Sequence, residues 1–159
     1  MAVSTNCFIN LPEAILIELF SYFSLYDFLQ LELVNHAWAN TIHHCGVWKS
    51  ITLYPSSIST DICMQHILFQ IVHRHGSCIR QLTLIRPEFL PIPYYFKRLS
   101  QLLTNLERII VYDSLSISDD QIGSILHTSK QSLTHISIIK CPSVTSKLFE
   151  TIALEDQDR

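Results

Sequence analysis

Apolar residues recur at helical spacing over the first part of the chain. A first helix is predicted from Pro12 to about Phe23, because Asn10 can cap its start and proline fits the first helical turn. Its apolar stripe consists of Ile15, Leu16, Leu19, Phe20 and Phe23. Such a stripe is typical of an amphipathic helix that buries one side.

Two further helices are predicted after the first. Ser24 can cap a second helix that carries Asp27 in its first turn. A third is expected from about Val34 to His43 and should end near Gly46. Its apolar residues at a spacing of four are Val34, Trp38 and Ile42. The apolar residues of these short helices exceed what a core of their own should need, so the pattern predicts a docking surface.

After residue 48 the helical spacing gives way to a strand-like phrase that occurs four times. The four copies are Trp48-x-x-Ile51-x-Leu53, Ile79-x-x-Leu82-x-Leu84, Leu106-x-x-Ile109-x-Val111 and Leu133-x-x-Ile136-x-Ile138. The second apolar positions are separated by 31, 27 and 27 residues. Internal periods of this length suit one strand plus one helix.

Helices are predicted between the strand phrases. One follows Asp61 and stops at Gly76, and another begins at about Tyr94 after three prolines. A third starts with Ser118 and Gln121, which form a capping-box pattern. The last begins at Thr145 or Ser146. The sequence therefore predicts an α/β array of strands with helices between them.

Side chains alternate along a strand, so the phrases also predict which residues point away from the buried side. The outward residues form an apolar row of Tyr54, Ile85, Tyr112 and Ile139, and beside it a row of Thr52, Thr83, Ile110 and Ser137. Arg108 and His135 lie further along. Exposed aromatic and aliphatic anchors are typical of a protein-binding surface. The alternative is that these residues only pack on one another as cross-strand pairs.

Composition limits the classes of function. The formal charge of -3 gives no electrostatic attraction to nucleic acid or an anionic membrane, and 48% apolar residues favour surface that is buried on a partner. No apolar run reaches the length of a membrane helix, and the first ten residues lack the features of a signal peptide. We therefore expect a cytoplasmic or nuclear protein whose five cysteines are thiols.

No catalytic motif is found, since the chain has three glycines, no phosphate-binding loop and no nucleophile elbow. The expectation is a non-enzyme without a cofactor or metal. One group of residue types that zinc uses is Cys63, His66, His73, His75 and Cys78. Its spacing fits no common zinc finger, so helix and loop residues are the simpler interpretation. A zinc-binding domain is kept as an alternative.

The N-terminal pattern resembles the F-box family. The residues that carry the resemblance are Leu11, Pro12, Ile15, Phe20, Phe28, Val34, Trp38 and Trp48, which match the family consensus without a gap. The resemblance implies a three-helix module that docks on the Skp-family adaptor of a cullin-RING ubiquitin ligase. It assigns the adaptor contact to Leu11, Pro12, Ile15, Phe20, Phe28 and Val34, and the internal packing to Trp38 and Trp48. The chain departs from the usual pattern at Ala14, Phe28 and Ala37.

The repeated phrases resemble leucine-rich repeats of the cysteine-containing class, most clearly in Leu133-x-x-Ile136-x-Ile138-x-x-Cys141-x-x-Val144-Thr145. The two resemblances together imply an α/β chain with a flexible N-terminus at 1–10, an F-box at 11–53, a short solenoid of parallel strands and outer helices at 48–153, and an acidic tail at 154–159.

The function implied is that of a substrate receptor of an SCF-type ligase. Through the adaptor it would join the cullin and RING subunits, and it would hold a protein target on Tyr54, Ile85, Arg108, Ile110, Tyr112, His135 and Ile139. The alternative within the same fold is a protein that binds the adaptor without a substrate and competes with longer family members. Under this alternative the array is truncated.

Overall fold

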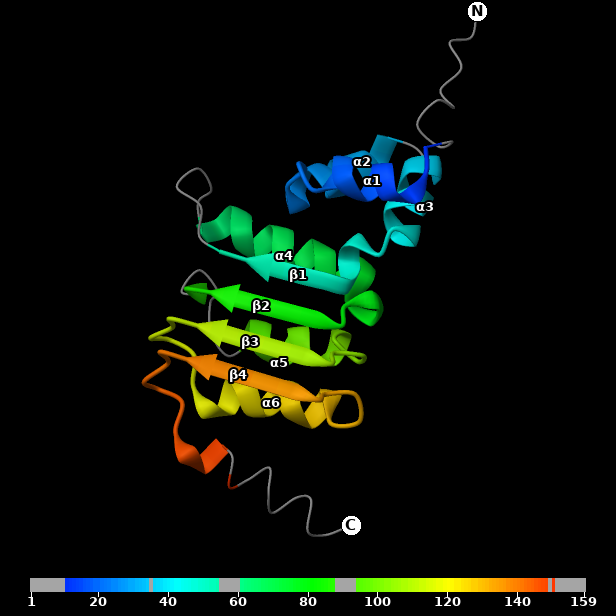
Figure 1. The fold of residues 1–159 in the computed structure, drawn as a ribbon. Coiled ribbons are helices and arrows are strands. Elements are labelled where there is room, and N and C mark those ends of the chain that lie inside the picture. Colours follow the sequence, from blue (N-terminus) through cyan, green and yellow to red (C-terminus); the bar gives the residue numbers. More distant parts are fainter. Residues whose placement is uncertain (1–10, 35, 55–60, 88–93, 149, 151–159) are drawn as a thin grey trace, which may run out of the picture. The chain divides into compact units, whose positions relative to one another are not determined.

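A computed structural model of the chain describes residues 11–34, 36–54, 61–87, 94–148 and 150. The chain divides into two units, Met1–Trp48 and Lys49–Arg159, and each is described by itself (Figure 1). The flexible N-terminus predicted at 1–10 and the acidic tail predicted at 154–159 lie outside the described residues. None of the helices within the described ranges has the length and apolarity needed to cross a bilayer.

The N-terminal unit contains the three predicted helices, α1 (Glu13–Phe20), α2 (Leu25–Val34) and α3 (His36–His44), followed by the 3-10 turn η1 (Val47–Lys49). Helix α1 is shorter than predicted. Its last residues continue as a tighter turn, in which the N–H groups of Tyr22 and Phe23 donate to the carbonyls of Leu19 and Phe20 at 3.2 and 3.1 Å. The prediction that α1 extends to Phe23 is therefore wrong by one turn.

The boundary between α2 and α3 also differs from the prediction. Val34 is the last residue of α2 and does not belong to α3, so the expected spacing of Val34, Trp38 and Ile42 on one helix is wrong. The start of α2 is as predicted. The Ser24 N–H donates to Asp27 Oδ2 at 2.8 Å, and the Asp27 N–H donates to Ser24 Oγ at 3.2 Å. Gly46 follows α3 with a φ of 67°, a left-handed conformation that suits glycine after a helix.

Aromatic side chains form the centre of the N-terminal core. Phe28 lies between Phe20 and Trp48, with ring centroids 5.4 and 5.9 Å away in edge-to-face geometry. Trp48 is 1% exposed and donates its Nε1–H to Glu32 Oε1 at 2.8 Å. The predicted internal role of Trp48 is confirmed, because it joins the end of the unit to α2.

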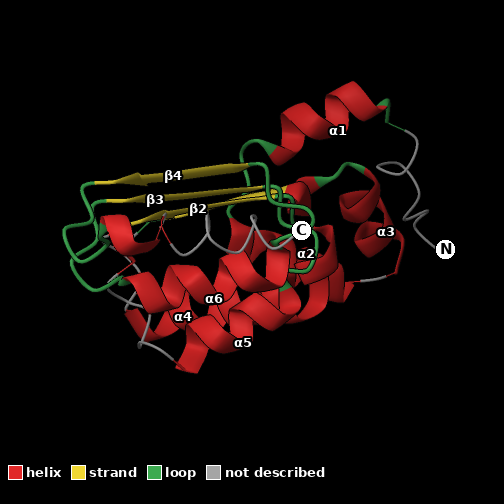
Figure 2. Ribbon diagram, turned by 90° about the horizontal axis from the view of Figure 1, so that it is seen from below, coloured by secondary structure: helices red, strands yellow, loops and turns green. Residues whose placement is uncertain are grey.

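The C-terminal unit alternates strands and helices. Its elements are β1 (Ser50–Leu53), α4 (Asp61–His75), the 3-10 turn η2 (Gly76–Cys78), β2 (Gln81–Ile85), α5 (Tyr94–Leu102), β3 (Arg108–Tyr112), α6 (Asp119–Ser129) and β4 (His135–Ile139). The four strands form one parallel sheet in the order β1-β2-β3-β4. Helices α4, α5 and α6 lie together on one side of it (Figure 2). A helical turn also covers residues 146–148.

The strand register is the one that the repeated phrase predicts. Leu82 pairs with Ile51 on one side and with Ile109 on the other, and Ile109 pairs with Ile136. The inward residues of β1 to β3 are completely or almost completely buried, whereas Ile136 and Ile138 of β4 are half-buried. The core of this unit therefore lies between the sheet and its helices and is best covered at β1 to β3.

The residue after each of the last three strands is left-handed. Arg86, Asp113 and Lys140 have φ values of 46, 57 and 55°. The Arg86 N–H donates to the Tyr112 carbonyl and the Asp113 N–H to the Ile139 carbonyl, both at 2.9 Å, so the ladder continues one residue past the strands. Left-handed φ values are uncommon for residues other than glycine. The sequence did not predict this repeated turn.

Hydrogen bonds join α6 to the helical turn after β4. The predicted capping box is confirmed, since the Ser118 N–H donates to Gln121 Oε1 at 2.7 Å. The carboxylate of the next residue, Asp119, accepts hydrogen bonds from the N–H and the hydroxyl of Thr145 at 2.7 and 2.5 Å. The hydroxyl of Thr145, and then its N–H, lower the pKa of Asp119 below its ordinary value.

The Asp119 contact should make stability depend on pH in the acid range. A lowered folded-state pKa adds stability above the unfolded-state pKa of about 3.9, and this stability is lost as the pH falls through the folded pKa. We expect the midpoint of urea unfolding to fall more steeply below about pH 5 for the unchanged chain than for Asp119→Asn. Asp120→Asn is the matched control, since its side chain makes no hydrogen bond to a described residue. Parallel pH profiles for the chain and Asp119→Asn would contradict this expectation.

Candidate functional site

The structure separates the six residues predicted to contact an adaptor into exposed and buried ones. Ile15 and Val34 are 51 and 63% exposed, and Pro12 is also exposed. Leu11 is half-buried. Phe20 and Phe28 are each 4% exposed and belong to the core of the unit. Pro12, Ile15 and Val34 are therefore available to a partner, while Phe20 and Phe28 support them from inside. The adaptor contact itself stays a prediction.

Apolar exposure is concentrated in the N-terminal unit, as the excess of apolar residues predicts. Seven of the ten exposed large apolar side chains among the described residues lie in α1, α2 and the turn between them. Those that the sequence analysis did not assign to a contact are Ile17, Tyr22, Phe23, Tyr26 and Leu33. One signal was present for Ile17, because it falls outside the apolar stripe of α1. The exposure of the other four depends on how the three helices pack, which helical spacing alone does not predict.

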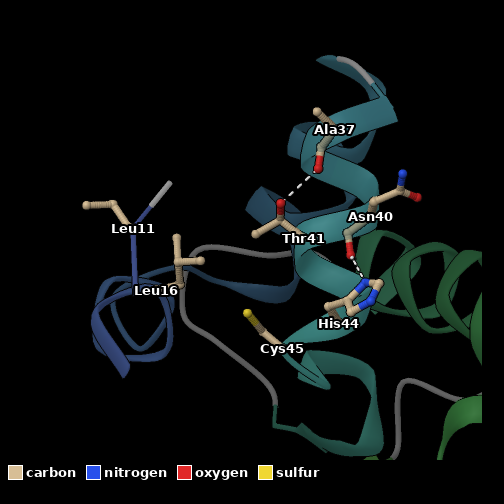
Figure 3. Close-up of a pocket in the computed structure, with 7 residues that line it drawn as sticks. All are labelled: Leu11, Leu16, Ala37, Asn40, Thr41, His44 and Cys45. Carbon is tan, nitrogen blue, oxygen red and sulfur yellow. Dashed lines mark hydrogen bonds between the residues drawn. The ribbon is translucent and has the colours of Figure 1, made fainter. Parts of the chain in front are cut away.

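A pocket of about 560 Å³ opens between the start of α1 and α3 (Figure 3). Leu11 and Leu16 line one side, and the other side consists of Ala37, Asn40, Thr41, His44 and Cys45. The polar groups of α3 bond along their own helix. Thr41 Oγ1 donates to the Ala37 carbonyl at 2.9 Å, and His44 Nδ1 lies 3.1 Å from the Asn40 carbonyl. The sequence did not predict this pocket, because it depends on the separation of two helices.

The second candidate surface is the side of the sheet opposite α4, α5 and α6. We call it the open face and define it by the outward residues Thr52 of β1, Gln81, Thr83 and Ile85 of β2, Arg108, Ile110 and Tyr112 of β3, and His135, Ser137 and Ile139 of β4. All of these side chains are exposed or half-buried. The alternation predicted for the strands is therefore confirmed, most clearly in β1 to β3.

Residues predicted to bind a target are brought together on the open face. Tyr112 pairs in register with Ile85 on one side and Ile139 on the other, and Arg108 pairs with His135. Ile110 lies midway along β3 between them. Tyr54 is 58% exposed and directly follows β1, so the register pairs do not include it. Two groups result, a cationic and imidazole pair where β3 and β4 start and an apolar row where the strands end.

Charged groups border the open face where the strands end. Lys140 Nζ lies 5.2 Å from the centre of the Tyr112 ring, a cation–π distance. A hydrogen bond with the Tyr112 side chain raises the pKa of Lys140 above its ordinary value, so the ammonium group stays charged. Arg86 Nε donates to Asp113 Oδ2 at 2.9 Å. The apolar row is thus flanked by two cations and one carboxylate.

Comparison with known proteins gives the N-terminal unit a family. Residues 8–54 match the F-box-like family model. The chain carries an F-box-like domain. The matched residues include α1, α2, α3, η1 and β1. A search of curated proteins found no match to the chain.

A domain of this family implies binding to a Skp-family adaptor in an SCF-type complex. The family match ends at Tyr54, whereas the structural division falls between Trp48 and Lys49. The resemblance to leucine-rich repeats is not matched by a family model, and what the structure shows there is a parallel sheet of four strands with helices.

The described residues give no support to the zinc alternative. They contain no group of three or more side chains that could hold a metal ion. His66 Nε2 lies 2.8 Å from the side-chain nitrogen of Gln70, and the His73 ring stacks on Phe69 with centroids 5.9 Å apart. The side chain of Cys63 lies outside the described residues. Cys141, which belongs to the fourth repeated phrase, is buried with Sγ 3.4 Å from the Ile139 carbonyl.

Proposed function

We propose that this chain is a substrate receptor of a cullin-RING ubiquitin ligase of the SCF type. The F-box-like domain binds the Skp-family adaptor, which connects the chain to the cullin and RING subunits. The C-terminal unit is a short leucine-rich-repeat array whose open face holds a protein target. The chain performs no chemistry of its own, and it acts in the cytoplasm or nucleus by keeping a target lysine near the ubiquitin-conjugating enzyme.

The observation that carries this proposal is the exposed apolar surface of the F-box-like domain. Ile15 on α1 and Val34 at the end of α2 are more than half exposed, next to a core that is already filled by Phe20, Phe28 and Trp48. Exposed aliphatic side chains in such number are costly unless a partner covers them. A family whose members bind an adaptor through this domain supplies that partner.

The strand register supports the second half of the proposal. Strand order follows chain order, successive strands are parallel, and equivalent residues of the phrase pair with one another. Helices α4, α5 and α6 lie on one side of the sheet (Figure 2), which supports a ligand on the other side. This is the arrangement that stacked units of one strand and one helix produce.

Adaptor binding is tested by placing charge on exposed residues without disturbing the core. We expect Ile15→Asp combined with Val34→Asp to weaken binding to a purified Skp-family adaptor by about 100-fold or more, because each aliphatic contact of a hot spot contributes about tenfold or more. Affinity is measured by isothermal titration calorimetry with the full chain, and circular dichroism checks that both proteins remain folded.

The control is Leu115→Asp, which places one carboxylate on a side chain of the C-terminal unit that is 73% exposed. It should leave the affinity for the adaptor unchanged. Equal adaptor affinity of the unchanged chain and the double variant would overturn the docking proposal.

Target presentation is tested separately, by affinity purification of the unchanged chain and the double variant from cells. Proteins that the ligase removes should be enriched on the double variant, because it holds targets that are not ubiquitinated. If the adaptor binds and no protein is enriched on either chain, the receptor role fails and the competitor role remains.

A further inference from the structure

The charge on the open face differs from that of the whole chain. The chain has a formal charge of -3, yet none of the residues that define the open face is aspartate or glutamate. Arg108 is the residue there with a permanent charge, and His135 pairs with it in register. Both are exposed. A partner that fits this face should therefore carry negative charge.

The acidic residues beside the face are already paired. Glu107 Oε1 lies 3.8 Å from Arg80 Nε, and Asp113 Oδ2 accepts from Arg86 Nε at 2.9 Å. Within the described ranges, no hydrogen bond or ion pair joins the Arg108 side chain to another residue. The guanidinium of Arg108 thus presents its donors to solvent, and guanidinium groups bind carboxylates through two parallel hydrogen bonds.

We propose that the open face binds an extended acidic segment of a target protein. One carboxylate of the segment lies on Arg108, with His135 beside it, and one large apolar side chain lies on Tyr112 between Ile85 and Ile139. The proposal deepens the receptor function proposed above and rests on it for the identity of the peptide as a target.

Strand geometry sets the spacing of the two contacts. Arg108 and Tyr112 are four residues apart on β3 and point to the same side, so their Cα atoms are separated by about 13 Å at roughly 3.3 Å a residue. An extended peptide aligned with the strands has the same rise. Its acidic and apolar residues must therefore also be four positions apart, which places both on one side of the peptide. The hydroxyls of Thr83 and Ser137 flank the segment between them.

The row on β2 to β4 explains the apolar requirement. Ile139 is 44% exposed, and Ile85 and Tyr112 are half-buried, so a side chain inserted here would cover aliphatic and aromatic surface. Lys140 lies against the Tyr112 ring, which adds a second cation at this end for acidic residues that follow the apolar one. A basic peptide would meet Arg108, Arg86 and Lys140 without a free carboxylate among them.

The test uses a displayed library of short random peptides, selected on the purified full chain. We expect enrichment of peptides that place Asp or Glu four positions from Phe, Tyr, Trp or Leu. A synthetic peptide of that class should lose about tenfold or more of its affinity when the acid becomes Gln or when the spacing changes by one. The Arg108→Glu chain should show the same loss of affinity for the acidic peptide. It should bind a peptide more tightly when Lys replaces the acidic residue of that peptide.

Lys97→Glu is the matched control, because it makes the same change of charge at an exposed residue of α5, on the helical side of the sheet. It should bind the peptide like the unchanged chain. The proposal is overturned if the selected peptides carry no acid, if no peptide is enriched, or if Arg108→Glu binds them normally. Binding only after the acid is replaced by phosphoserine overturns the assignment to a carboxylate.

The peptide measurement tests the proposed peptide class, and the experiments in cells test the receptor function, so one can fail without the other. Peptide affinity is measured directly on the purified chain, so it stands even if no target is enriched from cells. Conversely, a target that accumulates on the docking variant and does not depend on Arg108 keeps the receptor function and removes this peptide class.

Discussion

Replacing Trp48 with alanine is expected to destabilise the N-terminal unit by about 3–5 kcal/mol, the usual cost of removing a large aromatic side chain from a core. Trp48 is 1% exposed, and its ring packs on Phe28 with centroids 5.9 Å apart. Its loss also leaves Glu32 Oε1 without the Nε1–H donor. A unit of this size has little stability in reserve, so adaptor binding should be lost together with the fold.

Trp48→Phe separates the two contributions of the side chain. Phenylalanine keeps an aromatic ring against Phe28 but fills less of the core than the indole. It also removes the hydrogen bond to Glu32, which contributes about 1 kcal/mol or somewhat more for a charged acceptor. Chemical unfolding followed by the fluorescence of Trp38 measures both variants. A stability of Trp48→Ala equal to that of Trp48→Phe would show that the ring does not hold the unit together.

Gly76→Ala is expected to destabilise the C-terminal unit by about 2–3 kcal/mol, the upper part of the range for overpacking. Gly76 follows α4 directly, and a Cβ atom there would lie 2.5 Å from the carbonyl oxygen of Leu102 at the end of α5. Because the obstacle is backbone, no side-chain rotation relieves the contact. The first turn after α4 would have to move away from α5.

Gly123→Ala is the matched control on α6. The nearest heavy atom to its Cβ would be Leu148 Cδ1 at 3.9 Å, an ordinary van der Waals distance. Alanine favours a helix interior over glycine by about 0.5–1 kcal/mol, so this variant should be neutral or more stable. Urea unfolding of the full chain compares the two. Equal midpoints for Gly76→Ala and Gly123→Ala would contradict the close approach of η2 and α5.

The sheet could be predicted from the sequence in more detail than the helical unit. Parallel strands that repeat an apolar phrase should align that phrase, because a shift by one residue would turn inward residues outward. The pairs of Leu82 with Ile109 and of Ile109 with Ile136 follow directly. The start of α6 was equally predictable, since Ser118 and Gln121 define it locally.

The helical unit was harder to predict because its helices are short and follow one another closely. Val34 satisfies the apolar spacing of α3, but α2 continues to it and α3 begins at His36. Leu16 and Ile15 are neighbours on α1, yet one is 6% and the other 51% exposed. Spacing within a single helix does not decide which of two adjacent apolar residues faces the core. That choice depends on where the other helices lie.

The candidate site was also predictable only in part. Sequence alternation placed Arg108 beside His135 and Tyr112 beside Ile139, which the register confirms. It gave no indication of the left-handed residues Arg86, Asp113 and Lys140, because their conformation is imposed by the turn that leads from each strand to the next helix. Charged residues at such positions have no local signature, whereas glycine or asparagine would have had one.

The order of the strands in the sheet predicts that the C-terminal unit opens strand by strand from its ends. Among the described residues, each strand pairs with the strands that come next to it in the sequence. The loss of an outer strand therefore removes one interface and leaves the others intact. The β4 end of the sheet is the less stable one, because Ile136 and Ile138 are only half-buried. The rate of amide hydrogen exchange should therefore rise from β2 toward β4. A ligand that contacts both β3 and β4 would stabilise β4, the strand that opens most easily.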